Sequence, residues 1–191
     1  MKHFTLNGEI RKIGNKAVIK AFRRQGLVPC NLYGQGMENV FFTVSEKELK
    51  GITHTPASYI VDLKLSDGNI YTAVLHEEQY HPVLDTCLHV DFLKVSEDKP
   101  VAIKIPLTIS GHAVGVQAGG KFQQMVRSLK VCGMMKDLPD DLGIDISNLH
   151  IGENIVAGSL KYDNLEILTP KNTIICTVKA TRQSAQAATT E

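Results

Sequence analysis

The segment YIVDLKLSDGNIYTAVL, residues 59–75, contains two apolar runs on either side of Asp67-Gly68. Toward its end the first run alternates between apolar and polar residues, as a strand with one buried face does. An Asp-Gly pair between two such runs is a strong hairpin signal, because both residues tolerate the left-handed backbone of a tight turn. The segment therefore predicts two antiparallel strands, 59–65 and 70–75.

Two neighbouring stretches continue the strand pattern. Residues 41–44 form a short apolar run, and the Ser-x-x-Glu spacing of Ser45-Glu46-Lys47-Glu48 predicts a capping box that opens a short helix. Residues 88–93 alternate cleanly, so we expect His89 and Asp91 on one face of a strand and apolar side chains on the other. Most of the first half of the chain is thus predicted to be strand.

The second half gives similar signals. Polar residues cluster at 96–99 and are followed by Pro100, which predicts a domain boundary at 95–100. The strand predicted at 101–109 contains Pro106, which lacks an amide N–H and therefore favours an edge position. Further short strands are predicted around residues 125–131, 143–146, 155–160 and 173–178.

These patterns predict a mainly β protein with short helices. Residues 1–94 and 95–180 are expected to form two mostly antiparallel β domains. The small and polar residues 181–191 are expected to be a disordered tail.

Composition excludes several classes. The 191-residue chain has a net charge of +1 and 43% hydrophobic residues, an ordinary globular balance. Its apolar runs fall far short of the ~20 residues of a membrane-spanning helix, and the N-terminus lacks the apolar core of a secretory signal. We therefore expect a cytoplasmic protein without membrane contact, whose scattered cysteines are buried free thiols rather than disulfide or zinc partners. These are Cys30, Cys87, Cys132 and Cys176.

The distribution of charge is more informative than its sum. No acidic residue lies between Glu9 and Glu38, an interval that holds six cations. Apolar residues within 13–25 recur at helical period, and Gly26 is suited to end such a helix. The cations are Arg11, Lys12, Lys16, Lys20, Arg23 and Arg24, and the apolar stripe is Ile13, Ala17, Val18, Ala21 and Phe22.

This basic segment points to a polyanionic partner. Like charges at neighbouring helical positions repel one another, and phosphate relieves that repulsion, with bidentate geometry where the cation is arginine. We therefore favour nucleic acid or another phosphate-rich partner over a plain solvated surface. The pattern alone leaves RNA, DNA and an acidic protein open.

The basic segment and its surroundings resemble a known family. The matching motifs, in order, are Arg11-Lys12, Gly14, Lys16, Arg23-Arg24-Gln25-Gly26-Leu27-Val28-Pro29-Cys30-Asn31-Leu32-Tyr33-Gly34, Glu78-Gln79-Tyr80-His81-Pro82, Leu88-His89-Val90-Asp91-Phe92, Ile105-Pro106-Leu107, Gly111, Gly115-Val116, Gly119-Gly120, Leu149 and Ile151-Gly152-Glu153. In this order and spacing, over residues 1–180, they resemble the bacterial 5S-rRNA-binding protein of the large ribosomal subunit. That family is large-subunit protein twenty-five, whose long form is the general stress protein Ctc.

The resemblance implies a barrel of six or seven strands with short helices, docked on 5S rRNA, and a second β domain that reaches across the ribosome surface. It implies a structural role in translation at the central protuberance, with neighbouring large-subunit proteins and rRNA as partners, and a monomer off the ribosome. Cations would contact phosphates, and the other side chains would contact 2′-hydroxyls or base edges. The RNA-facing residues, neighbouring cations included, would be Arg11, Lys12, Lys16, Lys20, Arg23, Arg24, Tyr33, Gln79, His89 and Asp91.

The chain departs from the family pattern at several positions. Asn15 stands where the family often has glycine, and Lys20 and Ala21 replace usual arginines. Lysine keeps the charge but lacks the bidentate fork of arginine, which puts guanidinium-specific contacts there in doubt. Cys30-Asn31 replaces a pair that is more usually small and apolar.

An enzyme is the first alternative. His76, His81, His89 and Asp91 could form a metal site, since His89 and Asp91 share a strand face. The chain has no HExxH motif, nucleophile elbow or P-loop. We therefore expect ordinary histidines, no catalytic residue, no metal and no cofactor.

A stress-related protein-interaction module is the second alternative. Four aspartates near Pro139 form an acidic patch, which is most simply a solvated loop but could contact a basic neighbouring ribosomal protein. They are Asp137, Asp140, Asp141 and Asp145.

Overall fold

The structure is a computed structural model that describes residues 1–34, 36–96 and 99–181. The chain divides into two compact units, Met1–Ile103 and Lys104–Glu191. Residues 182–191 of the predicted tail lie outside the described residues. The predicted boundary after residue 94 stays a prediction, because the linker includes residues 97 and 98, which are also not described.

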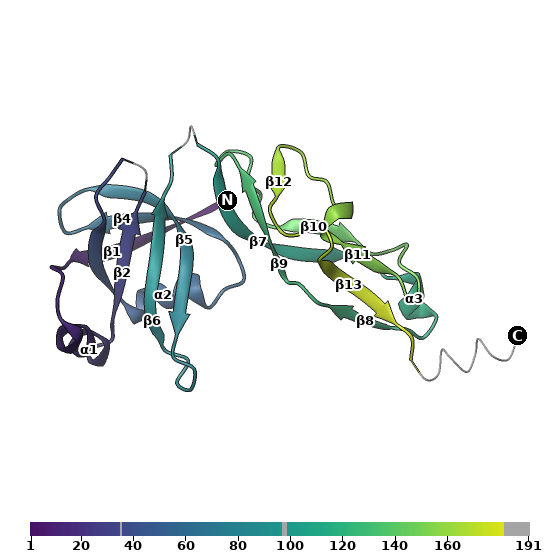
Figure 1. Cartoon of the computed structure of the whole chain (residues 1–191), viewed down its shortest axis with the longest axis horizontal. Coiled ribbons are helices and arrows are strands. Elements are labelled where there is room, and N and C mark those ends of the chain that lie inside the picture. Colours follow the sequence, from purple (N-terminus) through teal and green to yellow (C-terminus); the bar gives the residue numbers. More distant parts are fainter. Residues whose placement is uncertain (35, 97–98, 182–191) are drawn as a thin grey trace, which may run out of the picture. The chain divides into compact units, whose positions relative to one another are not determined.

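Six strands in the described part of the first unit close into a barrel, in the order β1-β3-β2-β6-β5-β4 (Figure 1). The mainly β fold with an N-terminal barrel is thereby confirmed. The pairing is mixed rather than wholly antiparallel, since β1 pairs with β4 and β2 with β6 in parallel. Parallel neighbours need a long crossover, and other strands intervene in sequence within both pairs. The strands are β1 (Lys2–Ile10), β2 (Leu27–Tyr33), β3 (Val40–Ser45), β4 (Tyr59–Leu65), β5 (Ile70–Tyr80) and β6 (Cys87–Lys94).

The predicted hairpin forms β4 and β5. Its turn has Gly68 at φ 82°, and the Asp67 side chain accepts a hydrogen bond of 2.9 Å from the Asn69 backbone N–H. Strand β5 continues to Tyr80, beyond the end predicted at residue 75, and its register against β6 shifts at two irregularities. Such irregularities change the direction in which side chains point. Simple alternation therefore could not show which side chains of residues 76–80 face outward.

Alternation along the strands fills the barrel with apolar side chains. Leu6, Leu32, Phe42 and Phe92 are all fully buried, and the two phenylalanine rings lie 5.8 Å apart between centroids. All four cysteines are free, as predicted; Cys132 is half-buried and the other three are buried.

Helix α2 (Glu46–Thr53) packs into this core through Leu49 and Ile52. The predicted helix is therefore present, but the predicted capping box is wrong in its hydrogen bonds. Ser45 is the N-cap residue and its side chain makes no cap hydrogen bond. The Glu48 carboxylate instead accepts a hydrogen bond of 3.4 Å from the backbone N–H of Asn7 on β1, because this helix is seated against the barrel.

Helix α1 (Lys16–Arg24) lies outside the strands at one end of the barrel (Figure 1). It begins later than the predicted stripe, because Asn15 is its N-cap and its side chain accepts a hydrogen bond of 3.2 Å from the Val18 backbone N–H. Gly26, at φ 74°, follows its C-terminal end as predicted. None of the helices in the described part of the chain is long and apolar enough to cross a membrane.

The second unit is also β-rich, with sheets of order β10-β7-β9-β12 and β11-β13-β8 among the described residues. The edge position predicted for the strand with Pro106 is wrong, since β7 lies between β10 and β9. Its pairing with β10 begins at Leu107, so the proline needs no N–H on that side. Strands β8 and β12 were not predicted. The elements are β7 (Val101–Ser110), α3 (Val114–Gln117), β8 (Lys121–Gln124), β9 (Ser128–Gly133), β10 (Leu142–Asp145), β11 (Asn154–Val156), a 3-10 helix (Ala157–Ser159), β12 (Leu165–Ile167) and β13 (Ile174–Lys179).

Candidate nucleic-acid interface

The outer wall of β2, β6 and β5 brings four of the predicted residues together. Alternation turns Cys30, Leu32, Val90 and Phe92 into the barrel, and so turns the intervening side chains of β2 and β6 outward. His89 pairs with Gln79, and Asp91 pairs with Glu77 on β5 and Asn31 on β2. We call this wall the outer face; its predicted members are Tyr33, Gln79, His89 and Asp91.

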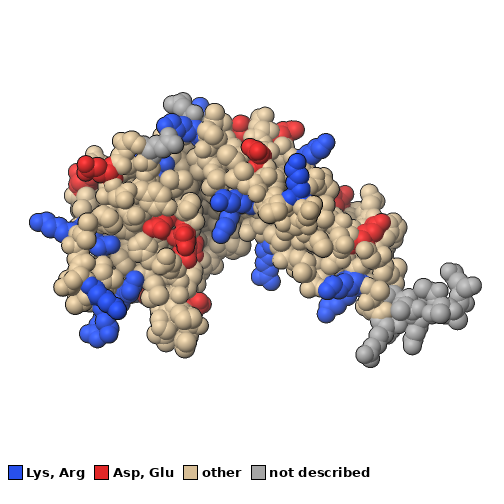
Figure 2. Space-filling view, viewed as in Figure 1, with Lys and Arg blue, Asp and Glu red and all other residues tan. Residues whose placement is uncertain are grey.

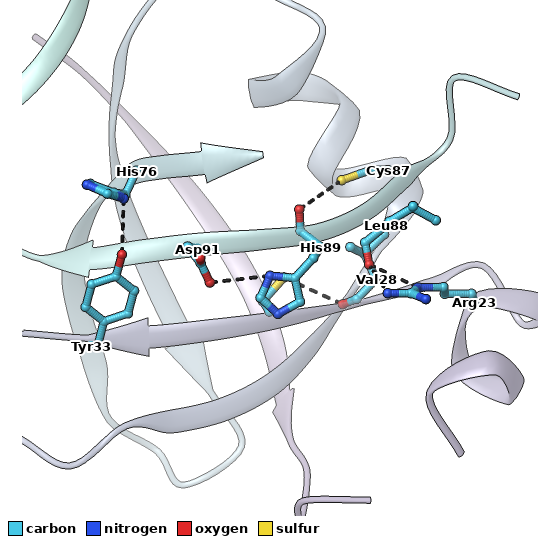
Figure 3. A network of polar contacts seen from close by, with 9 residues as sticks. Arg23, Val28, Tyr33, His76, Cys87, Leu88, His89 and Asp91 are labelled. Atoms are coloured by element: carbon cyan, nitrogen blue, oxygen red, sulfur yellow. Dashed lines mark hydrogen bonds and ion pairs between the residues drawn. The ribbon is translucent and has the colours of Figure 1, made fainter. Parts of the chain in front are cut away.

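Polar contacts link neighbouring side chains on the outer face (Figure 3). A hydrogen bond of 3.1 Å joins the Tyr33 hydroxyl to His76 Nδ1. His89 Nδ1 lies 3.3 Å from Asp91 Oδ1. The face therefore presents two histidines and an acidic group, each held by a partner.

Arg23 connects α1 to this wall. Its Nε and Nη2 donate hydrogen bonds of 3.0 and 2.8 Å to the backbone carbonyl of Leu88 on β6 (Figure 3). Among the described residues, no ion pair joins Arg23 to a carboxylate. Part of its hydrogen-bonding capacity is thus used to position the helix beside the outer face.

Arg11 lies at the other margin of the face. Its guanidinium carbon is 5.5 Å from the centroid of the Phe41 ring on β3, a cation–π distance. Its Nε is buried and has no hydrogen-bond partner among the described residues. Arg11 is therefore held by packing and keeps donor capacity for a ligand.

The remaining predicted cations are exposed. Lys12, Lys16, Lys20 and Arg24 all lie on the surface, and none is in an ion pair within the part of the chain that the structure describes. Figure 2 shows Lys and Arg atoms gathered where α1 lies, and Asp and Glu atoms gathered over β5 and β6. The site thus combines a basic helix with a more acidic strand surface.

The apolar stripe predicted for α1 does not enter the core. No residue of α1 is buried; Ile13 is 78% exposed and Val18 40% exposed. Phe22 is half-buried, and so is Ile19, which lies outside the predicted stripe. The barrel therefore covers the apolar side of this helix only in part.

The environment of the outer face shifts two pKa values. Burial of the ring lowers the pKa of His89, and the positive charges of Arg11 and Arg23 act in the same direction against the opposing effect of Asp91. Burial raises the pKa of Tyr33, and the negative charges of Asp91 and Glu77 add to that shift. The neutral forms of both side chains, which can donate and accept hydrogen bonds, are favoured at neutral pH.

The residues of the predicted metal alternative have separate structural roles. His81 Nδ1 accepts hydrogen bonds of 3.2 and 3.1 Å from the backbone N–H groups of Val83 and Leu84, which orders the β5–β6 turn. His76 contacts Tyr33, and only His89 and Asp91 lie together. In the described residues, no group of three or more His, Cys, Asp or Glu side chains could hold a metal ion.

The acidic patch of the second unit is exposed at Asp137, Asp140, Asp141 and Asp145. Asp145 Oδ1 accepts hydrogen bonds of 2.9 and 2.6 Å from the backbone N–H and the hydroxyl of Ser147. These local bonds lower its pKa. At least this aspartate therefore has a role in its own loop.

Sequence reasoning missed three residues of the outer face: Asn31, His76 and Glu77. Asn31 was identifiable, since it alternates with buried residues along β2. His76 and Glu77 follow the register shift after Leu75, which no sequence signal indicated.

Comparison with known proteins agrees with the motifs. Residues 6–92 match the Ribosomal L25p family, and residues 100–182 match the C-terminal domain of ribosomal protein TL5. The chain is 44% identical over 183 residues to the large ribosomal subunit protein bL25 of Azobacteroides pseudotrichonymphae, covering 95% of this chain and 96% of that protein. It is 39% identical over 188 residues to bL25 of Porphyromonas gingivalis, covering 98% of both chains. The chain therefore belongs to the L25 family of large-ribosomal-subunit proteins, in its long form with a TL5-type C-terminal domain, and is a structural constituent of the ribosome rather than an enzyme.

Proposed function

We propose that the outer face and α1 together bind 5S rRNA. The observation that carries the proposal is the position of α1: Arg23 holds this basic helix at the edge of a wall of hydrogen-bonding side chains. A ribosomal protein has rRNA as a partner, and the choice of 5S rRNA rests on the family resemblance of the motifs on this face.

The residues of the proposed interface contact RNA in two different ways. The exposed cations Lys12, Lys16, Lys20 and Arg24 neutralise phosphates and supply affinity that falls with salt. Tyr33, Gln79, His89 and Asp91 offer donors and acceptors to 2′-hydroxyls and base edges, which is how proteins distinguish RNA surfaces. Asp91 repels phosphate, so its role is to accept a hydrogen bond from a hydroxyl or a base amine.

The remaining assignments follow from this one. We infer that residues 1–94 suffice for 5S rRNA binding, that residues 95–180 contact neighbouring large-subunit proteins or rRNA, and that the free protein is a monomer. Charge reversal at Asp140 and Asp141 tests the protein contact. It should weaken incorporation into large subunits while leaving 5S rRNA binding intact, and unchanged incorporation would contradict that contact.

The main experiment measures binding of the full chain to 5S rRNA, with transfer RNA as competitor, across a salt series. Selective binding is expected, with a salt dependence that reports several phosphate contacts. The variant His89→Ala should lower affinity by about tenfold, as loss of one good polar contact to RNA does. Equal competition by transfer RNA would overturn the proposal.

The chain offers a matched control. His3 Nδ1 lies 3.0 Å from Asp62 Oδ2, a second histidine–aspartate contact on β1 and β4. Strand β4 is three places from β2 around the closed barrel, and therefore on the opposite wall. His3→Ala should leave RNA affinity unchanged. An equal loss in both variants would show that histidine removal acts through the fold rather than through the interface.

A further inference from the structure

Asn31 lies on the outer face, next to Asp91 where β2 pairs with β6. On β2 its side chain points away from the core, between the fully buried Cys30 and Leu32. It pairs with Phe41 on β3 and with Asp91 on β6. Asp91 is a member of the outer face, and Phe41 lies beneath Arg11, another of the predicted RNA-facing residues.

The Asn31 side chain has an unsatisfied acceptor. Its Oδ1 is buried and has no hydrogen-bond partner within the described residues. A buried polar atom without a partner destabilises a fold, and an apolar, β-branched side chain would avoid that cost on a strand. Retention of an asparagine here is thus unfavourable for folding alone.

The groups around Asn31 do not supply the missing donor. Arg23 donates through Nε and Nη2 to the Leu88 carbonyl, and the Asp91 carboxylate is itself an acceptor. Arg11 lies over Phe41 with its own Nε unpartnered, and its charge lowers the pKa of His89 on β6. An acceptor and a donor are therefore both unsatisfied in one small region of the wall.

We propose that Asn31 is a specificity-determining residue of the RNA interface, whose amide oxygen accepts a hydrogen bond from an O–H or N–H group of the bound RNA. This inference rests on the proposed function. Phosphate has no hydrogen to donate at neutral pH, so the contact must be with a ribose 2′-hydroxyl or a base N–H. The terminal torsion of asparagine is broad, which lets the amide turn toward the ligand without moving β2.

The variant Asn31→Val tests the proposal, because RNA affinity and stability should change in opposite directions. Affinity of the full chain for 5S rRNA should fall by about 5–30-fold. The melting temperature of the free protein should rise by about 4 °C, since the unsatisfied acceptor is removed. Asn7→Val is the matched control: Asn7 is an exposed asparagine on β1, paired with Lys64 of β4, and should leave affinity unchanged.

Chemical footprints of 5S rRNA separate the two possible donors. Loss of protection from a 2′-hydroxyl acylating reagent in the Asn31→Val complex would assign the contact to ribose. Loss of protection from a base-specific reagent (kethoxal for guanine, dimethyl sulfate for adenine and cytosine, carbodiimide for uracil) would assign it to a base N–H. Unchanged affinity, a lower melting temperature, or weaker binding with no footprint altered would each overturn the proposal. If the unmodified chain itself does not bind 5S rRNA selectively, the proposed function fails first and the two failures are distinguished.

Discussion

The two helices of the barrel unit have similar lengths and different roles. Helix α2 buries Leu49 and Ile52 in the core, although its N-cap Ser45 makes no side-chain hydrogen bond. Helix α1 buries no residue, has an N-cap that does bond, and carries its cations at the surface. Packing therefore stabilises α2, whereas a local cap and the Arg23 contact hold α1.

The largest expected effect is on protein stability, and it arises from the packing of α2. Leu49→Ala should lower the free energy of unfolding by about 2–5 kcal/mol, because a fully buried leucine leaves a cavity. Val18→Ala on α1 should change it by less than about 0.5 kcal/mol, since that side chain is exposed. Chemical denaturation measures both. Similar losses in the two variants would contradict the contrast between the helices.

The next effect is on RNA affinity and concerns α1. The double variant Lys16→Ala with Lys20→Ala should bind 5S rRNA about tenfold or more weakly and reduce the salt slope by about 1.5, since two phosphate contacts are lost. Stability should not fall, because no carboxylate partner of either lysine is described. The matched control is Lys47→Ala with Lys50→Ala on α2. An equal loss there would mean that overall charge, rather than α1, determines binding.

A smaller effect distinguishes the two N-caps. Asn15→Ala should destabilise α1 by about 1 kcal/mol, because its side chain bonds the Val18 N–H. Hydrogen exchange at that amide should speed up, while global unfolding changes little. Ser45→Ala should cost only a few tenths of a kcal/mol, since no hydrogen bond is lost. Faster exchange throughout the barrel in Asn15→Ala would show that α1 is not a local unit.

The smallest effect is a shift in a titration. Because burial and nearby cations lower the pKa of His89, stability from the neutral ring is complete above the ordinary value of about 6.5 and is lost as pH falls below it. Arg23→Gln removes one of those cations and should raise the pKa of His89, measured by NMR. His3 provides the control resonance. An unchanged His89 pKa would mean that α1 does not stay seated against β6 in solution.

Several features followed from local sequence patterns. Asp67-Gly68 predicted the hairpin, because the turn demands a left-handed residue at Gly68. Alternation at 88–93 correctly separated His89 and Asp91 from the buried Val90 and Phe92. Gly26 was predicted to end α1, and does so at positive φ. Each of these features depends on neighbours within a few residues.

Other features depended on distant partners and were missed or wrong. Alternation could not identify the outward direction of His76 and Glu77, because a register shift precedes them. The apolar residues within 13–25 recur at helical period, as predicted. How far they are buried depends on the position of α1 relative to the barrel strands, which the period does not indicate. The strand with Pro106 was assigned to an edge because proline lacks an N–H, and its pairing with β10, which comes far later in the chain, was not foreseen.

The sequence by itself determined the mainly β class, the β4–β5 hairpin, the helices α1 and α2, the basic segment and the family, because turn chemistry, periodicity and motif order are local properties of the chain. Only the tertiary structure decided that β1 pairs with β4 and β2 with β6, that Arg23 binds the Leu88 carbonyl, and that Asn31 has an unpartnered oxygen beside Asp91. Those facts depend on register between strands far apart in sequence. The pairing of such strands decides which side chains are buried and which of their polar atoms have hydrogen-bond partners.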